Sequence, residues 1–152
     1  MVKNNISRDL IGRCGLYCGA CDIYRAYVDK NEKKQKRMAK YFKCKPSQIR
    51  CHGCQNLNHE NWSQDCKILQ CLNRNEYKYC YECNNTERCD IFQKLNKRYN
   101  DIPLGNLKKL KKIGEERWLK EQISRWSCPQ CGKPFDYETE KCPSCGFVLR
   151  SK

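Results

Sequence analysis

The sequence has few of the large apolar side chains that fill a protein core: it contains four Phe, three Trp and two Met among 152 residues. Hydrophobic residues make up 39% of the chain, and without the 15 cysteines this share falls to about 29%, against about 45–50% in an average globular protein. A large hydrophobic core is therefore excluded. Domains with too little apolar surface to bury usually gain their stability from cross-links or metal ions.

Long apolar segments are also missing. The first residues, MVKNNISRDLIGRC, lack the apolar stretch of a secretory signal peptide, and no segment approaches the roughly 20 apolar residues that span a bilayer. We therefore expect a cytoplasmic protein without membrane contact, in which thiols stay reduced. An odd number of cysteines could not all form disulfides in any case. Reduced cysteines at short spacings in such a protein indicate metal binding.

Motifs of common enzyme classes are absent as well. The sequence has no HExxH, no glycine-rich phosphate loop and no Ser–His–Asp order. Cys14, Cys18 and Cys21 have the C-x3-C-x2-C spacing of radical enzymes that use S-adenosylmethionine. Those enzymes need a large α/β barrel, however, and only 131 residues follow Cys21. We expect no catalytic residues, and we keep an iron–sulfur or thiol-based redox protein as the second alternative.

The sequence is rich in cysteines at the spacing of metal ligands. The C-terminal segment is the clearest example of such a motif. It reads CPQCG at 128–132 and CPSCG at 142–146. Glycine after the second cysteine of each half allows the backbone N–H groups to turn toward the sulfurs. Four thiolates make the closed tetrahedral set of a structural zinc site. Cys128, Cys131, Cys142 and Cys145 therefore predict a zinc ribbon of short β-hairpins.

Eleven further cysteines lie in residues 1–100. Spacing makes a candidate four-thiolate site of Cys51, Cys54, Cys66 and Cys71. The first trio is Cys14, Cys18 and Cys21, and the second trio is Cys80, Cys83 and Cys89. Cys44 is isolated. The trios could form one site with two spare thiols, two zinc ions with bridging sulfurs, or one iron–sulfur cluster at Cys14, Cys18 and Cys21. Cys44 is interpreted as a half-buried apolar residue. His52 and His59 are interpreted as loop residues, because thiolates are abundant.

The formal charge is +14, from 31 Lys and Arg against 17 Asp and Glu. Each zinc with four thiolates carries −2, so three such sites would reduce the charge to +8. The basic runs KNEKKQKR and LKKLKK, together with Tyr77, Tyr79 and Tyr81, could bind RNA. The candidate phosphate contacts are Lys33, Lys34, Lys36, Arg37, Lys108, Lys109, Lys111 and Lys112. Solvated helix faces are the other interpretation of these runs.

Apolar periodicity predicts helices within residues 22–43, 65–74, 86–99 and 107–126, with Thr86 as a candidate N-cap. Asp101 and Pro103 suit a helix start. Strand signals are scarce outside the C-terminal segment. The expected fold is small, metal-stabilised and mainly α with irregular loops, ending in a β-hairpin zinc ribbon. The expected divisions are a cysteine-rich metal-binding domain at 1–100, a helical connector at 101–126 and the zinc ribbon at 127–152.

The ordered segments CGLYCGACDIY, IRCHGC, CKILQC, YCYEC and CDIFQKL resemble the domain of unknown function 3795 family, which consists of small cysteine-rich microbial proteins. The tail is similar to members that continue with a helical segment and a terminal zinc ribbon. The resemblance implies that every cysteine of residues 1–100 except Cys44 belongs to the family pattern. It also implies binding of a metal, presumed to be zinc, and no established reaction.

These observations together predict a zinc-binding protein with about three zinc ions per chain. We expect a non-catalytic interaction or adaptor protein whose partner is a protein or RNA. The first alternative is an RNA- or other nucleic-acid-binding zinc protein.

Overall fold

The computed structural model describes residues 8–56, 61–62 and 66–149. Within these ranges the chain is mainly helical and contains no β-strand. The α-helices are α1 Asp22–Val28, α2 Glu32–Phe42, α3 Lys67–Arg74, α4 Asp90–Arg98, α5 Ile102–Ile113 and α6 Glu115–Arg125. Short 3-10 turns include η1 Arg8–Leu10, η2 Cys18–Ala20, η3 Pro46–Gln48, η5 Cys80–Glu82 and η6 Thr86–Arg88. None of the described helices is long and apolar enough to cross a membrane.

Two of the expected helices are each divided into two. Residues 22–43 form α1 and α2, because Lys30 has a left-handed φ of 51° and Asn31 begins a new helix by accepting a hydrogen bond from Lys34 N at 3.0 Å. The C-terminal helical segment begins at Ile102 after Asp101, and Gly114, with φ 83°, separates α5 from α6. Local breakers therefore override a periodicity that runs across them.

Thr86 does not begin a helix in the way that the sequence suggests. Its hydroxyl donates to the carbonyl oxygens of Cys80 and Cys83, the latter at 2.8 Å, so it closes the preceding turn. The N-cap of α4 is Cys89. The prediction of Thr86 as N-cap is wrong because the hydroxyl bonds backward along the chain.

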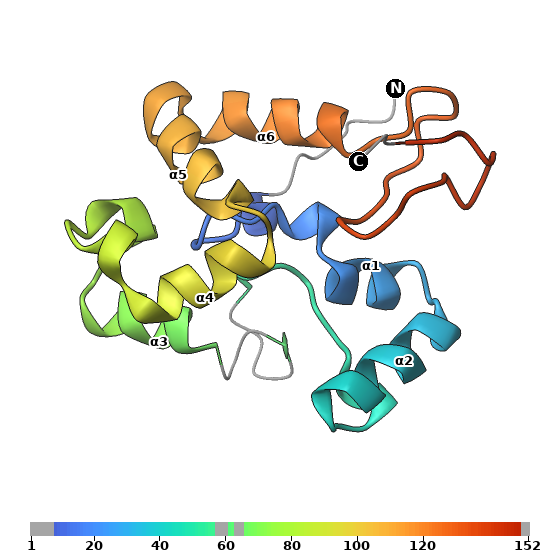
Figure 1. Ribbon diagram of the computed structural model, residues 1–152, viewed down its shortest axis with the longest axis horizontal. Helices are drawn as coiled ribbons and strands as arrows, with labels where there is room; N and C mark the ends of the chain where they lie inside the picture. Colours follow the sequence, from blue (N-terminus) through green and yellow to red (C-terminus); the bar gives the residue numbers. More distant parts are fainter. Residues whose placement is uncertain (1–7, 57–60, 63–65, 150–152) are drawn as a thin grey trace.

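The helices surround residues 11–21, here called the N-terminal loop, which runs through the middle of the molecule (Figure 1). Helices α5 and α6 lie on one side of this loop, α3 and α4 on another, and α1 with α2 on a third. The larger hydrophobic cluster includes Trp118, Trp126, Phe92, Leu107 and Leu110, each at most 1% exposed. A smaller cluster fills the space around α1 and α2: Ile23, Ala26, Met38, Ala39, Ile49 and Cys51.

Gly15 allows the N-terminal loop to lie directly against α5. Its φ of +94° is in the left-handed region, and a Cβ at this position would lie 2.3 Å from the carbonyl oxygen of Pro103. The Gly15 carbonyl accepts a hydrogen bond from Asn106 Nδ2 at 2.8 Å. The glycine between Cys14 and Leu16 is therefore required by a close approach of two backbones.

The predicted C-terminal β-hairpins are wrong. Residues 127–149 contain only two isolated bridges, Ser127 with Pro134 and Lys141 with Val148. Pro134 has no N–H with which to extend a ladder, and each half is a tight turn closed by its own backbone. Cys128 N donates to Lys133 O, and Cys142 N donates to Phe147 O, both at 2.8 Å. This C-terminal module (residues 127–149) is therefore made of loops rather than strands.

We expect Gly15→Ala to destabilise the protein by about 2 kcal/mol or more, because it adds backbone strain and a steric clash with α5. Gly105→Ala is the matched control, since a Cβ at Gly105 in α5 meets nothing within 4 Å. It should stabilise the protein by about 0.5–1 kcal/mol. Urea unfolding of both variants measures the difference, and similar free energies of unfolding would contradict the close approach.

Candidate metal centres

The four cysteines of the C-terminal module come together at one point. Their sulfur atoms all lie within 4.8 Å of one another. Cys128 Sγ lies 3.7 Å from Cys145 Sγ, and Cys131 Sγ lies 3.5 Å from Cys142 Sγ. Cys128 and Cys142 are buried, whereas the other two sulfurs belong to exposed residues. This arrangement could hold a metal ion, and within the described ranges no other three Cys, His, Asp or Glu side chains are gathered so closely.

The backbone turns of this module favour a thiolate at one of the four cysteines, Cys142. Gly132 and Gly146 both have φ 75°, and their N–H groups donate to the carbonyl oxygens of Cys128 and Cys142 at 2.8 Å. Hydrogen bonds from the backbone N–H groups of Cys145 and Ser144 lower the pKa of Cys142 to about 6, against the opposing effect of burial. A thiolate is the form of cysteine that binds metals.

A second group of cysteines surrounds the N-terminal loop. It comprises the first trio and three cysteines from the segment that follows: Cys14, Cys18, Cys21, Cys51, Cys54 and Cys66. A hydrogen bond with Cys18, together with burial, raises the pKa of Cys54 well above its usual value. Burial and then the neighbouring Cys54 raise the pKa of Cys51 to about 12. Thiols this close cannot all ionise unless a cation lies among them.

A third group combines the second trio with Cys71. Cys71, Cys80, Cys83 and Cys89 line one cavity. Sequence spacing places Cys71 with Cys51, Cys54 and Cys66, but those three residues do not line this cavity. Cys66 lies near Cys14 and Cys54 and also influences Cys80.

The remaining candidates lie outside these groups. Cys44 is half-buried behind the end of α2, where its N–H donates to Ala39 O at 2.9 Å. The ring of His52 packs edge-on against Tyr27, with centroids 5.1 Å apart. His59 is outside the described residues.

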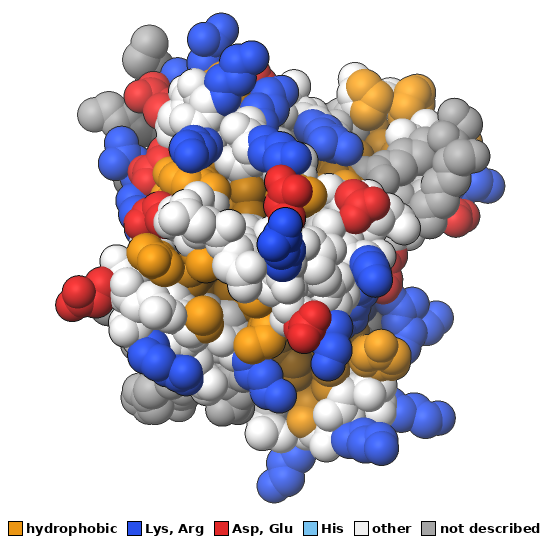
Figure 2. Space-filling model, turned by 60° about the vertical axis from the view of Figure 1, so that its left-hand side comes forward, with side chains coloured by type: hydrophobic (Ala, Val, Ile, Leu, Met, Phe, Trp, Pro, Cys, Tyr) orange, Lys and Arg blue, Asp and Glu red, His pale blue; other side chains and the backbone are white. Residues whose placement is uncertain are grey.

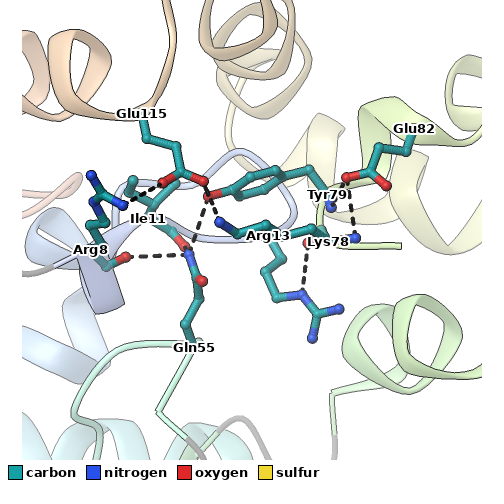
Figure 3. A network of polar contacts seen from close by, with 8 residues as sticks. All are labelled: Arg8, Ile11, Arg13, Gln55, Lys78, Tyr79, Glu82 and Glu115. Atoms are coloured by element: carbon teal, nitrogen blue, oxygen red, sulfur yellow. Dashed lines mark hydrogen bonds and ion pairs between the residues drawn. The ribbon is translucent and has the colours of Figure 1, made fainter. Parts of the chain in front are cut away.

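A polar network positions the N-terminal loop relative to the cysteine segments that follow (Figure 3). At its centre the buried Tyr79 hydroxyl donates to Glu115 Oε1 at 2.8 Å. Lys78 also binds Glu115, and Arg8 lies 3.8 Å from the same carboxylate. Gln55 Nε2 donates to Ile11 O at 2.8 Å. The network thereby joins η1, the segment after Cys54, the segment before Cys80 and the start of α6.

Arg13 makes a second connection beside Cys14. Its guanidinium donates to Lys78 O at 2.7 Å, Tyr77 O at 2.6 Å and Asn73 Oδ1 at 2.7 Å. The carbonyl of Arg13 accepts from Cys80 N at 3.0 Å. One arginine thus aligns the first cysteine motif with the end of α3 and with Cys80. No sequence motif indicates this role, because the partners are mostly backbone carbonyls.

The C-terminal module is fixed to the same loop by Tyr137. Its hydroxyl accepts from Tyr17 N at 2.9 Å, and its N–H donates to Ala20 O at 3.0 Å. Its ring packs against Trp126 with centroids 4.5 Å apart. The module therefore contacts the loop that carries the first three cysteines.

Half of the candidate RNA-binding residues are engaged within the protein. The ion pairs are Lys34 with Asp136, Arg37 with Glu138 at 3.4 Å, Lys108 with Glu87 at 3.2 Å, and Lys109 with Glu121. Lys33, Lys36, Lys111 and Lys112 are exposed. On the face in Figure 2, Lys and Arg side chains are scattered, with acidic and apolar side chains between them. Tyr79, a candidate for base stacking, is only 1% exposed and stacks on Tyr81.

The hydrogen bond between Tyr79 and Glu115 should appear as a coupling energy in a double-mutant cycle of Tyr79→Phe and Glu115→Gln. Lys78, then Tyr79 and Arg8, lower the pKa of Glu115. The contribution of its carboxylate to stability is therefore complete at pH 7 and is lost as the pH falls below the ordinary carboxyl range. We expect a coupling of at least about 0.5 kcal/mol at pH 7 in urea unfolding.

Tyr81→Phe paired with Glu115→Gln is the control for this cycle. Tyr81 stacks on Tyr79, so its substitution perturbs the same region without removing the hydroxyl that binds Glu115. This pair should be additive within about 0.5 kcal/mol. Equal coupling in the two cycles would contradict the assigned hydrogen bond.

Comparison with known proteins gives one match. A family model described as "Protein of unknown function (DUF3795)" matches residues 10–94. The matched segment contains the second and third cysteine groups and ends before α5, α6 and the C-terminal module. No curated protein and no solved structure matches the chain.

Proposed function

We propose that this chain, which belongs to the DUF3795 family, is a zinc-binding protein whose metal ions stabilise its fold and whose role is interaction with a partner rather than catalysis. Zinc at about three ions per chain is part of this proposal. So is a cytoplasmic location, where its 15 free cysteines would remain reduced. The family description names no function, so the proposal depends on the geometry of the cysteine groups.

The sulfur separations in the C-terminal module carry the proposal. A tetrahedral zinc ion with Zn–S bonds of about 2.3 Å requires sulfur atoms about 3.8 Å apart. The separations between Cys128 and Cys145, 3.7 Å, and between Cys131 and Cys142, 3.5 Å, are close to this value. Sulfur atoms at these distances would suit a single tetrahedral ion better than a four-iron cluster, whose cysteine sulfurs lie farther apart.

The composition of the ligand set favours a structural ion. Four thiolates fill the coordination of zinc, whereas a catalytic zinc keeps one position open for water or substrate. The module supplies the four sulfurs of Cys128, Cys131, Cys142 and Cys145. An ion there would hold the two turns together, and Tyr137 and Trp126 would transmit that order to the rest of the fold.

The residues expected to contact RNA do not favour RNA as the partner, so the proposed partner is a protein. Four of the eight candidate phosphate contacts are paired with carboxylates of the same chain. Tyr79, the middle tyrosine, is buried. A positive groove lined by free cations and stacking aromatics, as single-stranded nucleic acid requires, is therefore not supported by these residues.

The metal proposal is tested by elemental analysis and native mass spectrometry of protein purified without oxygen. Cys131→Ser should reduce the zinc content by one ion per chain and lower the unfolding temperature, because three thiolates remain at a site that needs four. Cys44→Ser, the control, should leave the zinc content unchanged. Iron with acid-labile sulfide in the wild-type protein, or no change in zinc for Cys131→Ser, would contradict the proposal.

RNA binding is tested by fluorescence anisotropy with a labelled single-stranded RNA at two salt concentrations. A protein of charge +14 should bind weakly at low salt through phosphate contacts, with a dissociation constant above about 1 μM at physiological salt. Submicromolar binding at physiological salt that is lost in a variant with Lys33→Glu and Lys36→Glu would establish RNA as the partner and overturn the proposed protein partner.

A further inference from the structure

We propose that Cys71, Cys80, Cys83 and Cys89 form a separate, closed four-thiolate metal site. The proposal rests on the proposed function, since it assigns ligands to one of the ions. All four side chains line a cavity of about 140 Å³, which Ile68, Leu72 and Phe92 also line. Their sulfur atoms are less closely gathered than those of the C-terminal module, so an ion in this cavity would draw the four thiolates together around itself.

The four cysteines reach this cavity from three elements. Cys71 lies within α3, Cys80 and Cys83 are the first residue and the C-cap of η5, and Cys89 is the N-cap of α4.

Hydrogen-bond donors point at the sulfurs of this group. The backbone N–H of Asn85 donates to Cys83 Sγ at 3.4 Å, and Asn75 Nδ2 donates to Cys71 Sγ at 3.6 Å. Cys89 makes no side-chain capping bond at the start of the nine-residue helix α4, where the helix dipole favours a thiolate. Such outer contacts orient and stabilise metal-bound ligands.

Helix geometry explains why Cys66 does not share an ion with Cys71. The sequence CKILQC becomes the N-cap and first turns of α3. Residues five apart on a helix differ by about 140° in direction and about 7.5 Å in height. The two sulfurs therefore face different sides, and Cys66 does not line the cavity that Cys71 lines. Cys66 lies instead near Cys14 and Cys54.

The test is alkylation of the metal-loaded wild-type protein with N-ethylmaleimide during stepwise addition of EDTA, with peptide mapping by mass spectrometry. Cysteines that share an ion become reactive together when it leaves. We expect Cys71, Cys80, Cys83 and Cys89 to react as one group, at a different EDTA concentration from Cys51 and Cys54. Reaction of Cys71 together with Cys51 and Cys54, or simultaneous reaction of all of these cysteines, would overturn the proposal.

A pair of variants provides the second measurement. Cys83→Ser should lose one metal ion per chain and make Cys71 and Cys89 reactive without EDTA. Cys66→Ser, the matched control, should leave Cys71 and Cys89 protected. Protection of Cys71 in Cys83→Ser, or its exposure in Cys66→Ser, would overturn the assignment. If either variant fails to fold, the wild-type series decides.

Failure of this inference can be told apart from failure of the proposed function. Wild-type protein that contains no metal and whose cysteines all react at once would overturn both. Metal-loaded protein with a different grouping of reactive cysteines would overturn only the four-thiolate site. Iron in place of zinc, with the grouping unchanged, would overturn the zinc proposal and support the site.

Discussion

The crowding of buried cysteines is the constraint on which the rest of this structure depends. Burial raises the pKa of Cys14, Cys51 and Cys80, and neighbouring cysteines raise each of them further. Thiols in this state can ionise together only around a cation. The chain has too few apolar residues for a large core, so in our account metal binding supplies the missing folding free energy. Three of the helices are tied to the cysteines, because α1, α3 and α4 each begin directly after a cysteine N-cap.

The N-terminal loop connects the cysteine groups mechanically. Gly15 brings it against α5, Arg13 aligns it with Cys80, and Tyr137 fixes it to the C-terminal module. Loss of one ion should therefore destabilise elements that are far away in the sequence. A chain held in this way presents a stable surface, which suits the partner binding that we propose.

Much of the fold could be predicted from the sequence, and the errors have local causes. The apolar periodicity located the helical regions, and Asp101 with Pro103 marked a true helix start. Periodicity could not reveal the breaks at Lys30 and Gly114, since both lie within otherwise regular patterns.

The C-terminal cysteines could be grouped by spacing because their partners are close in sequence, although the hairpins expected around them are wrong. Cys71 could not be assigned in this way. Its direction depends on the turn of α3, and Cys83 and Cys89, which line the same cavity, come from later segments. Arg13 and Tyr137 carry no motif, because they bind backbone atoms.

The measurement that tests the central claim most directly is near-UV circular dichroism of the fully reduced protein before and after complete metal removal. Our account predicts that the aromatic signal collapses without metal and returns when one metal equivalent per site is added. An apoprotein that retains the signal and its thermal unfolding transition would contradict it.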